Sequence, residues 1–222
     1  MITVSSRSRS PLSLTELKST ATRRKLFKEV ACTVISVSLL AIGAKLKLVA
    51  PFTPVPFTLQ TMFLHYLLFV YGKSAWRYVA TYVVLGLVGV PVFAYGGGPT
   101  YMLSPTFGYI VGFVLGTLLA GFIAPKGVLS LKKGLLAGFT QLATIYVVGV
   151  TWLTAWYALF SGVLSTNALV LSITTGLIPF MPWDIAKLFA ALVIGRVTVV
   201  AYYAVIRKIT DLLPALKGES SL

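Results

Sequence analysis

Long apolar runs, separated by short polar or Gly- and Pro-rich breaks, dominate this chain. A membrane-spanning helix needs about 20 mostly apolar residues. The pattern predicts helices over residues 26–48, 57–72, 75–90, 107–124, 134–162 and 182–209. A shorter apolar segment, 168–178, is expected to be a half-helix or a loop packed on the protein. We therefore expect an all-α membrane protein with six transmembrane helices.

The composition agrees with this fold class. Of the 222 residues, 57% are hydrophobic and only 11% are charged, and the mean hydropathy is +0.90. In a typical soluble domain about a quarter of the residues are charged. Because so few charges cannot cover a globule of this size, much of the apolar surface must face lipid.

The positions of the basic residues predict how the chain is oriented. The net charge is +14, and seven of the 19 Lys and Arg residues precede residue 29. Cytoplasmic loops carry an excess of Lys and Arg. We expect both termini and the basic loops at 73–77 and 126–133 to be cytoplasmic, in a multi-pass protein of the plasma membrane. This placement argues against nucleic acid as a partner, although the charge alone is compatible with it.

The chain divides into a long membrane domain and two polar ends. Residues 1–25 are rich in Ser, Thr and Arg and show no apolar core before Leu26, so we expect no cleavable signal peptide here but a disordered basic cytoplasmic tail. Residues 26–212 form the predicted transmembrane domain, and residues 213–222 form a short cytoplasmic tail.

Two loops on the predicted outer side are unusual because they are apolar and contain no charge. Residues 51–56 contain three prolines, and residues 91–106 contain Gly96-Gly97-Gly98-Pro99. Irregular backbone near a membrane is tolerated where it is buried in protein or lines a cavity. We expect both loops to fold as a lid over the outer mouth of a cavity.

Asp184 and Lys187 are the strongest candidates for binding a polar ligand. Asp184 is the only acidic residue between residues 30 and 210, and Lys187 lies on the same helix face three positions later. Pro182 suits a first helical turn and places Asp184 near a positive helix N-terminus. Charges inside a membrane are costly and usually functional. The alternative is an ion pair that only orients the helix.

Weaker candidates surround this pair. The Gln60 amide can donate and accept hydrogen bonds, either to a ligand or to another helix. Tyr82 is a candidate contact or an interfacial anchor. His65 has no Cys, His or carboxylate partners in metal-binding spacing, so we predict no metal site and a packing or hydrogen-bonding role. A face of small residues predicts close helix packing at Gly108, Gly112 and Gly116.

The chemistry that the sequence lacks favours a carrier over an enzyme. Acyl transfer needs a nucleophile with a base, and aspartyl chemistry needs two acids. A single Asp–Lys pair supplies neither, so we predict no catalytic residue and no cofactor. No phosphate-binding loop of the GxxxxGK[ST] type is present. A membrane-embedded enzyme remains the rival class.

Several of these segments resemble the BioY family, the biotin-binding S components of energy-coupling-factor (ECF) transporters. The segment PVPFTLQT resembles a family signature, and PWDIAK contains the family's PxDxxK pattern. Two further segments resemble its YLxLGxxGxPVF and GG…GPTGGY stretches. The matching segments are 54–61, 182–187, 82–94, 96–98 and 104–109, and together they span roughly residues 39–200.

The resemblance implies a six-helix fold and binding of biotin from the extracellular side. It also implies a membrane-embedded T component and two cytoplasmic ATPase subunits as partners, although some members are thought to function without them. Other possibilities are an S component for another vitamin and an ATPase-independent biotin carrier. The ligand-binding residues that the resemblance implies are Asp184 and Lys187 at the ureido end of biotin, Gln60 and Tyr82 in support, and Gly97 and Gly98 in the covering loops.

Overall fold

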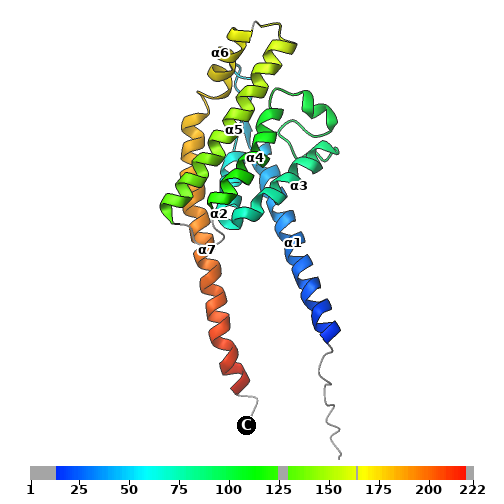
Figure 1. Ribbon diagram of the computed structural model, residues 1–222, viewed down its shortest axis with the longest axis vertical. Helices are drawn as coiled ribbons and strands as arrows, with labels where there is room; N and C mark the ends of the chain where they lie inside the picture. The colour runs from blue at the N-terminus through cyan, green and yellow to red at the C-terminus, as the bar shows by residue number, and fades with distance from the viewer. Residues whose placement is uncertain (1–13, 125–129, 164, 219–222) are drawn as a thin grey trace, which may run out of the picture.

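The computed structural model describes residues 14–124, 130–163 and 165–218, which are mostly helical (Figure 1). Within these ranges the chain forms seven α-helices, two 3₁₀ helices and one pair of short strands. The helices are α1 (Leu14–Lys45), α2 (Gln60–Tyr71), η1 (Gly72–Ser74), α3 (Ala75–Leu87), η2 (Pro99–Leu103), α4 (Phe107–Ile123), α5 (Leu131–Phe160), α6 (Ser165–Gly176) and α7 (Met181–Gly218). The strands are β1 (Lys47–Leu48) and β2 (Phe57–Thr58).

The first and last helices extend beyond their predicted ends. Helix α1 begins at Leu14, inside the segment that we expected to be a disordered tail, and α7 continues to Gly218. The expectation of disorder was therefore wrong for residues 14–25. Apolar content marks the part of a helix that meets lipid, whereas the helix itself continues through Leu, Lys, Arg and Ala residues with high helix propensity. The remaining parts of the predicted tails, 1–13 and 219–222, lie outside the described residues.

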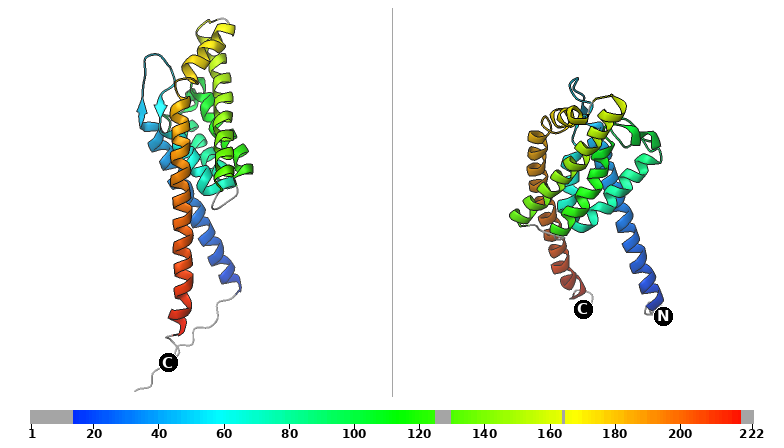
Figure 2. Two further views of the ribbon diagram at one scale, coloured as in Figure 1. Left: turned by 90° about the vertical axis from the view of Figure 1, so that its left-hand side faces the viewer. Right: turned by 45° about the horizontal axis from the view of Figure 1, so that its top comes forward.

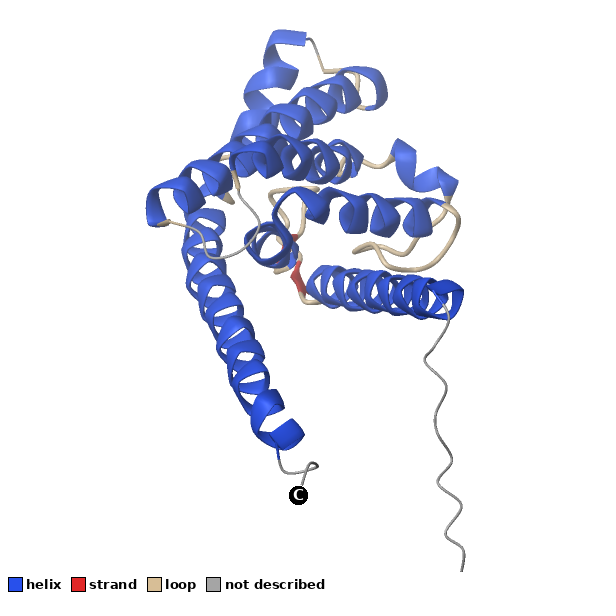
Figure 3. Ribbon diagram, turned by 60° about the horizontal axis from the view of Figure 1, so that its bottom comes forward, coloured by secondary structure: helices blue, strands red, loops and turns tan. Residues whose placement is uncertain are grey.

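The predicted helix over 57–72 begins three residues late because its start is a strand. Phe57 and Thr58 pair in antiparallel fashion with Leu48 and Lys47, at the end of α1 (Figure 3). The prolines between residues 51 and 56 keep the intervening chain out of a helix and allow it to turn back. The segment 46–59, called the outer hairpin below, therefore connects α1 to α2.

Helices α4 and α5 pack closely along the predicted face of small residues. A Cβ atom at Gly112 would lie 2.9 Å from Ile145 Cα, and one at Gly116 would lie 2.7 Å from the carbonyl oxygen of Gln141. No larger side chain fits at these distances without moving the helices. The prediction of close helix packing at these glycines is confirmed.

The helices form a bundle from which two long ends project. Helices α1 and α7 extend past the others at the same end of the molecule (Figures 1 and 2). In the described part of the chain, three helical segments are long and apolar enough to cross a membrane: Thr22–Lys45, Leu131–Phe160 and Met181–Asp211. The chain is thus a multi-pass membrane protein. Because α2, α3 and α4 have only 12 to 17 residues, the number of six crossings stays a prediction.

Candidate ligand-binding site

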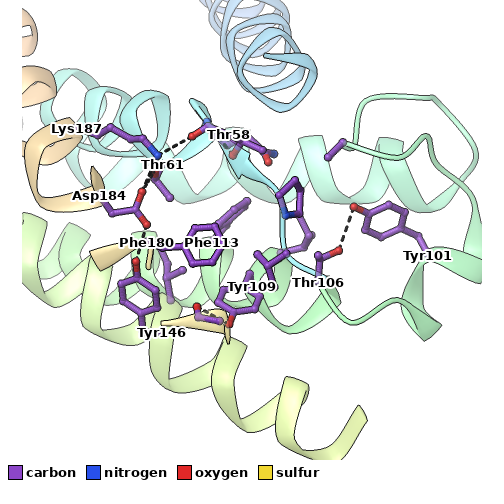
Figure 4. Close-up of a pocket in the computed structure, with 17 residues that line it drawn as sticks. Thr58, Thr61, Tyr101, Thr106, Tyr109, Phe113, Tyr146, Phe180, Asp184 and Lys187 are labelled. Carbon is purple, nitrogen blue, oxygen red and sulfur yellow. Dashed lines mark hydrogen bonds and ion pairs between the residues drawn. The ribbon is translucent and has the colours of Figure 1, made fainter. Parts of the chain in front are cut away.

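A narrow cavity of about 60 Å³ lies where the start of α7 meets α2, α4, α5 and the two outer loops. Figure 4 shows Asp184, Lys187 and Tyr146 at one end and Tyr101 and Thr106 at the other. Aromatic and aliphatic side chains line the space between them. These lining residues include Val55, Tyr109, Ile110, Phe113, Ile145 and Phe180. The cavity thus has a charged end, an apolar middle and a hydroxyl-bearing end.

Three groups hold the carboxylate of Asp184 at the charged end. The Thr61 hydroxyl and the Lys187 ammonium group donate to Oδ1 at 2.7 and 2.8 Å. The Tyr146 hydroxyl donates to Oδ2 at 2.7 Å. Asp184 lies in the first turn of α7 and is only 5% exposed. The predicted position of Asp184 beside Lys187 at a helix N-terminus is confirmed.

Lys187 connects this carboxylate to the outer hairpin. Its Nζ donates to the carbonyl oxygen of Thr58 at 2.7 Å, and it lies 3.4 Å from the Thr61 hydroxyl. An ammonium group has three N–H donors. Two of these N–H groups form short hydrogen bonds, to Thr58 and Asp184. The third forms only the long contact with Thr61, which a ligand could replace at little cost.

The remaining hydrogen-bonding capacity defines what this end can recognise. Each carboxylate oxygen accepts about two hydrogen bonds. Oδ1 of Asp184 already accepts two and Oδ2 accepts one. One lone pair on Oδ2 and one weakly engaged N–H of Lys187 therefore remain, and both residues line the same cavity. This arrangement suits a neutral group that carries an N–H next to a carbonyl, such as an amide or a urea.

Gln60 and Tyr82 lie together, but they have different relations to the cavity. Gln60 lines it, and Gln60 Nε2 donates to the Tyr82 hydroxyl at 2.6 Å. Tyr82 is completely buried on α3 and is not among the lining residues. Tyr82 therefore supports Gln60 from behind.

Gly97 and Gly98 shape the loop 88–106, called the glycine loop below. A Cβ atom at Gly97 would lie 2.9 Å from the carbonyl oxygen of Gly86, too close for a side chain. Gly98 has a φ of +107° and donates to the same carbonyl oxygen at 2.7 Å. Neither glycine is among the residues that line the cavity. The glycine loop instead reaches the cavity through Ala94, Tyr101 and Thr106.

The hydroxyl-bearing end of the cavity is uncharged. The Thr106 hydroxyl donates to the Tyr101 hydroxyl at 3.2 Å. Burial raises the pKa of the Tyr101 phenol above its usual value, so the group stays protonated at neutral pH. The phenol oxygen accepts from Thr106, and within the described ranges Tyr101 donates no hydrogen bond, so its proton is available to a ligand. This end can therefore donate a hydrogen bond to a ligand without contributing a charge.

Two lysines where α1 meets the outer hairpin bind the glycine loop. Lys45 Nζ donates to the carbonyl oxygen of Phe93 at 2.9 Å, and Lys47 Nζ donates to that of Ala94 at 2.6 Å. Lys47 also lies over the Tyr95 ring, 4.0 Å from its centroid. These contacts hold the start of the outer hairpin against the glycine loop. The two loops that we predicted to form a lid both supply residues to the cavity.

The sequence analysis missed the two residues that, with Lys187, bind the carboxylate of Asp184. Tyr146 is one of 11 tyrosines, and its position opposite Asp184 depends on how α5 packs against α7. Its spacing from Gly138, Leu142 and Gly149 could have placed it on the buried face of its helix. Thr61 lies within the PVPFTLQT segment, but its chemistry alone gave no reason to prefer it to other threonines.

His65 belongs to a separate buried network. Its Nδ1 lies 2.7 Å from Gln141 Oε1, and Gln141 Nε2 donates to the Thr117 hydroxyl at 2.7 Å. The predicted hydrogen-bonding role of His65 is thus confirmed. Among the residues described here, no cluster of His, Cys, Asp and Glu has the arrangement of a metal site.

Comparison with known proteins places these features in a family. The model of the BioY family matches residues 14–204. The biotin transporter BioY of Thermotoga maritima is 36% identical over 163 residues, which cover 72% of this chain and 89% of that protein. A probable biotin transporter BioY of Pyrococcus horikoshii is 35% identical over 171 residues, covering 76% and 94% of the two chains. These relatives are named as transporters, which agrees with the prediction of a carrier that is not an enzyme.

The fold also has a counterpart among solved structures. The crystal structure of the S-component for biotin from an ECF-type ABC transporter matches with a TM-score of 0.56. The two sequences are 23% identical, and the match covers 78% of this chain and 91% of that one. The described fold is therefore that of an ECF S component. Together with the match over residues 14–204, these similarities show that the chain belongs to the BioY family.

Proposed function

We propose that this protein takes up biotin across the plasma membrane as the substrate-binding S component of an ECF-type transporter. Its relatives are named biotin transporters, and the protein of similar fold is an S component for biotin. In this proposal biotin enters from the outside and binds beneath the outer hairpin and the glycine loop. Both termini lie in the cytoplasm, as the distribution of basic residues predicts.

The observation that carries this proposal is that Asp184 keeps one unused lone pair and Lys187 one weakly engaged N–H in the same cavity. The ureido group of biotin presents N–H groups next to a carbonyl and carries no charge. It can donate to Asp184 Oδ2 and accept from Lys187 without separating the ion pair. A buried ion pair that keeps its own contacts avoids the large cost of an unpaired charge.

The rest of the cavity supports the same ligand. Beyond the charged end, Phe113 and Phe180 offer an apolar surface for a fused ring and an alkyl chain. At the far end, the free proton of the Tyr101 hydroxyl suits a carboxylate, which only accepts hydrogen bonds. The order polar, apolar, polar along the cavity follows the order of groups along biotin.

The chain itself has no nucleotide-binding motif of the GxxxxGK[ST] type. In our proposal, a membrane-embedded T component and two cytoplasmic ATPase subunits supply the energy. The support is the similar structure, which is part of an ECF-type ABC transporter. Uptake of labelled biotin, in a host without other biotin importers, should require co-expression of these partners. Full uptake by the chain alone would instead identify a carrier that works without ATPases.

The site is tested by calorimetric titration of biotin into the purified protein and its Asp184→Asn variant. The amide keeps the shape of the carboxylate but removes its charge and one acceptor oxygen, so affinity should fall by about 100-fold or more. Asp211→Asn is the matched control, because Asp211 is a largely exposed acid near the other end of the same helix. Undiminished affinity in a folded Asp184→Asn variant would refute the assignment of the site.

A further inference from the structure

Positive charge gathers on α1 just before its contact with α3. Four exposed basic residues occur within six positions, and among the described residues none of their side chains has a hydrogen bond or an ion pair. The neighbouring acid is engaged elsewhere, because Glu29 lies 3.5 Å from the Arg77 guanidinium group and accepts from the Tyr78 hydroxyl at 3.2 Å. The four basic residues, called the α1 basic cluster below, are Arg23, Arg24, Lys25 and Lys28.

The length of α1 places this cluster at a membrane surface. The apolar span of the helix is Thr22–Lys45, and Lys45 reaches the glycine loop at the opposite end. Counted back from Lys45, about 20 residues of helix rise about 30 Å and cross the hydrocarbon layer, ending near Lys25. On α7, Arg207 lies about 35 Å along the helix from Asp184. Because α1 and α7 project at the same end (Figures 1 and 2), both basic segments lie at one surface.

Two large apolar side chains accompany these charges. Leu26 is 64% exposed and Phe27 is 77% exposed, and both lie between basic residues of the cluster. Basic and apolar side chains side by side suit the boundary between headgroups and hydrocarbon, because each reaches the medium that it prefers. A soluble anion would pair with the charges but leave Leu26 and Phe27 in water. The apolar neighbours therefore favour a lipid surface.

We propose that the α1 basic cluster binds the headgroups of phospholipids that carry a net negative charge. The exposed Lys and Arg side chains pair with lipid phosphates, and Leu26 and Phe27 insert among the acyl chains. Near an anionic surface each Lys or Arg strengthens binding about fivefold. The bound headgroups hold this end of α1 at a fixed depth. The assignment to the cytoplasmic leaflet rests on the orientation proposed above, whereas the binding of anionic lipid does not.

Native mass spectrometry of the full-length protein in detergent, titrated with phosphatidylglycerol or phosphatidylcholine of equal chain length, tests this surface. The wild type should bind phosphatidylglycerol at least about tenfold more tightly. Arg24→Gln with Lys28→Gln, one turn apart on one helix face, should remove most of this preference. Lys132→Gln with Lys133→Gln is the matched control, because it removes two exposed charges at the start of α5. If both double variants weaken phosphatidylglycerol binding equally, only total charge matters and the inference fails.

Two further measurements identify the source of the negative charge. Phe27→Gln keeps every charge but should weaken phosphatidylglycerol binding by about threefold or more, because apolar contact with the acyl chains is lost. Millimolar glycerol phosphate or an acidic peptide such as polyglutamate should not displace the lipid. Displacement by either would identify a site for a soluble anion and would overturn the proposal. All variants should keep the wild-type melting temperature, since the substituted side chains are exposed.

Discussion

At the scale of single residues, the binding capacity of the site depends on how the oxygens of Asp184 are shared. Thr61 and Lys187 donate two hydrogen bonds to Oδ1, which can accept no more, whereas Tyr146 donates one to Oδ2, which can accept a second. In our proposal a ligand therefore meets a carboxylate that three hydrogen bonds hold in place and that has one acceptor position left. Such a pre-oriented group loses little freedom on binding, which favours affinity.

Tyr146→Phe tests this pre-orientation. The substitution removes one hydrogen bond to a charged group, worth about 1.5–3 kcal/mol, and frees Oδ2 to be hydrated or to turn. We expect biotin affinity, measured by calorimetry, to fall by about tenfold or more. Tyr157→Phe is the control, because Tyr157 is a buried tyrosine of the same helix whose hydroxyl contacts Thr175. Equal affinities for both variants would show that Tyr146 does not shape the site.

The sequence could predict part of this site. Asp184 and Lys187 stood out because acids are so rare in the chain that one flanked by long apolar runs needs an explanation. Tyr146 and Thr61 could not be chosen in this way, since tyrosine and threonine are common in membrane helices. Their roles depend on three helices meeting at one point, and no local pattern encodes that meeting. The same limit explains why Tyr82 was grouped with the ligand contacts although it lies behind Gln60.

At the scale of elements, the close approach of α4 and α5 supports one wall of the cavity. Tyr109 and Phe113 on α4, and Ile145 and Tyr146 on α5, all line the cavity. The glycines between these helices therefore set the distance between two sets of lining residues. Glycine is less favourable in a helix interior than most other residues. We therefore attribute the glycines at this interface to the close packing of the two helices.

Gly112→Val should destabilise the protein, because its Cβ would meet the backbone of Ile145 at 2.9 Å. Overpacking of this kind costs about 1–3 kcal/mol. We expect a lower melting temperature in detergent, measured by thermal aggregation. Leu115→Ile, at a half-exposed position of the same helix, should leave the melting temperature unchanged. If Gly112→Val melts at the wild-type temperature, the two helices are not in close contact.

Element boundaries were predictable where apolar runs end at Gly or Pro. Helices α3 and α4 begin where we expected and end within three residues of their predicted ends. The strand at Phe57–Thr58 was not predictable, because its partner β1 lies ten residues earlier, just after the end of α1. A strand of two residues is too short to show the alternation of apolar and polar positions that marks a strand. A short apolar run is compatible with a helix as well as with a strand.

At the scale of the whole molecule, Lys45 at the end of α1 and Lys47 in the outer hairpin hold the glycine loop. In our proposal these two contacts keep the site closed. Replacing both Lys45 and Lys47 by Met removes the hydrogen bonds to Phe93 and Ala94. We expect bound radiolabelled biotin to dissociate at least about fivefold faster, because two charge-assisted bonds are lost. Replacing Lys132 and Lys133 by Met, at the exposed start of α5, should not change the rate. An unaltered rate in the first variant would mean that the loops close without these lysines.

The predicted orientation can be checked with single cysteines in a Cys32→Ser background. A membrane-impermeant maleimide added to whole cells should label Lys47→Cys but not Lys133→Cys. Both positions are exposed in the structure, so access to them depends on the side of the membrane. The reverse labelling pattern would place the cavity opening on the cytoplasmic side.

The length of α7 has a mechanical consequence. This continuous helix has 38 residues, so it is about 57 Å long, whereas the hydrocarbon layer is about 30 Å thick. One end carries Asp184, and the other projects beyond the bundle (Figure 1). The helix is therefore a long rod with the proposed ligand contact at one end and a projecting second end far away. A tilt of about 10° at the ligand end would displace the projecting end by about 10 Å, so a small local adjustment becomes a large signal at the opposite surface.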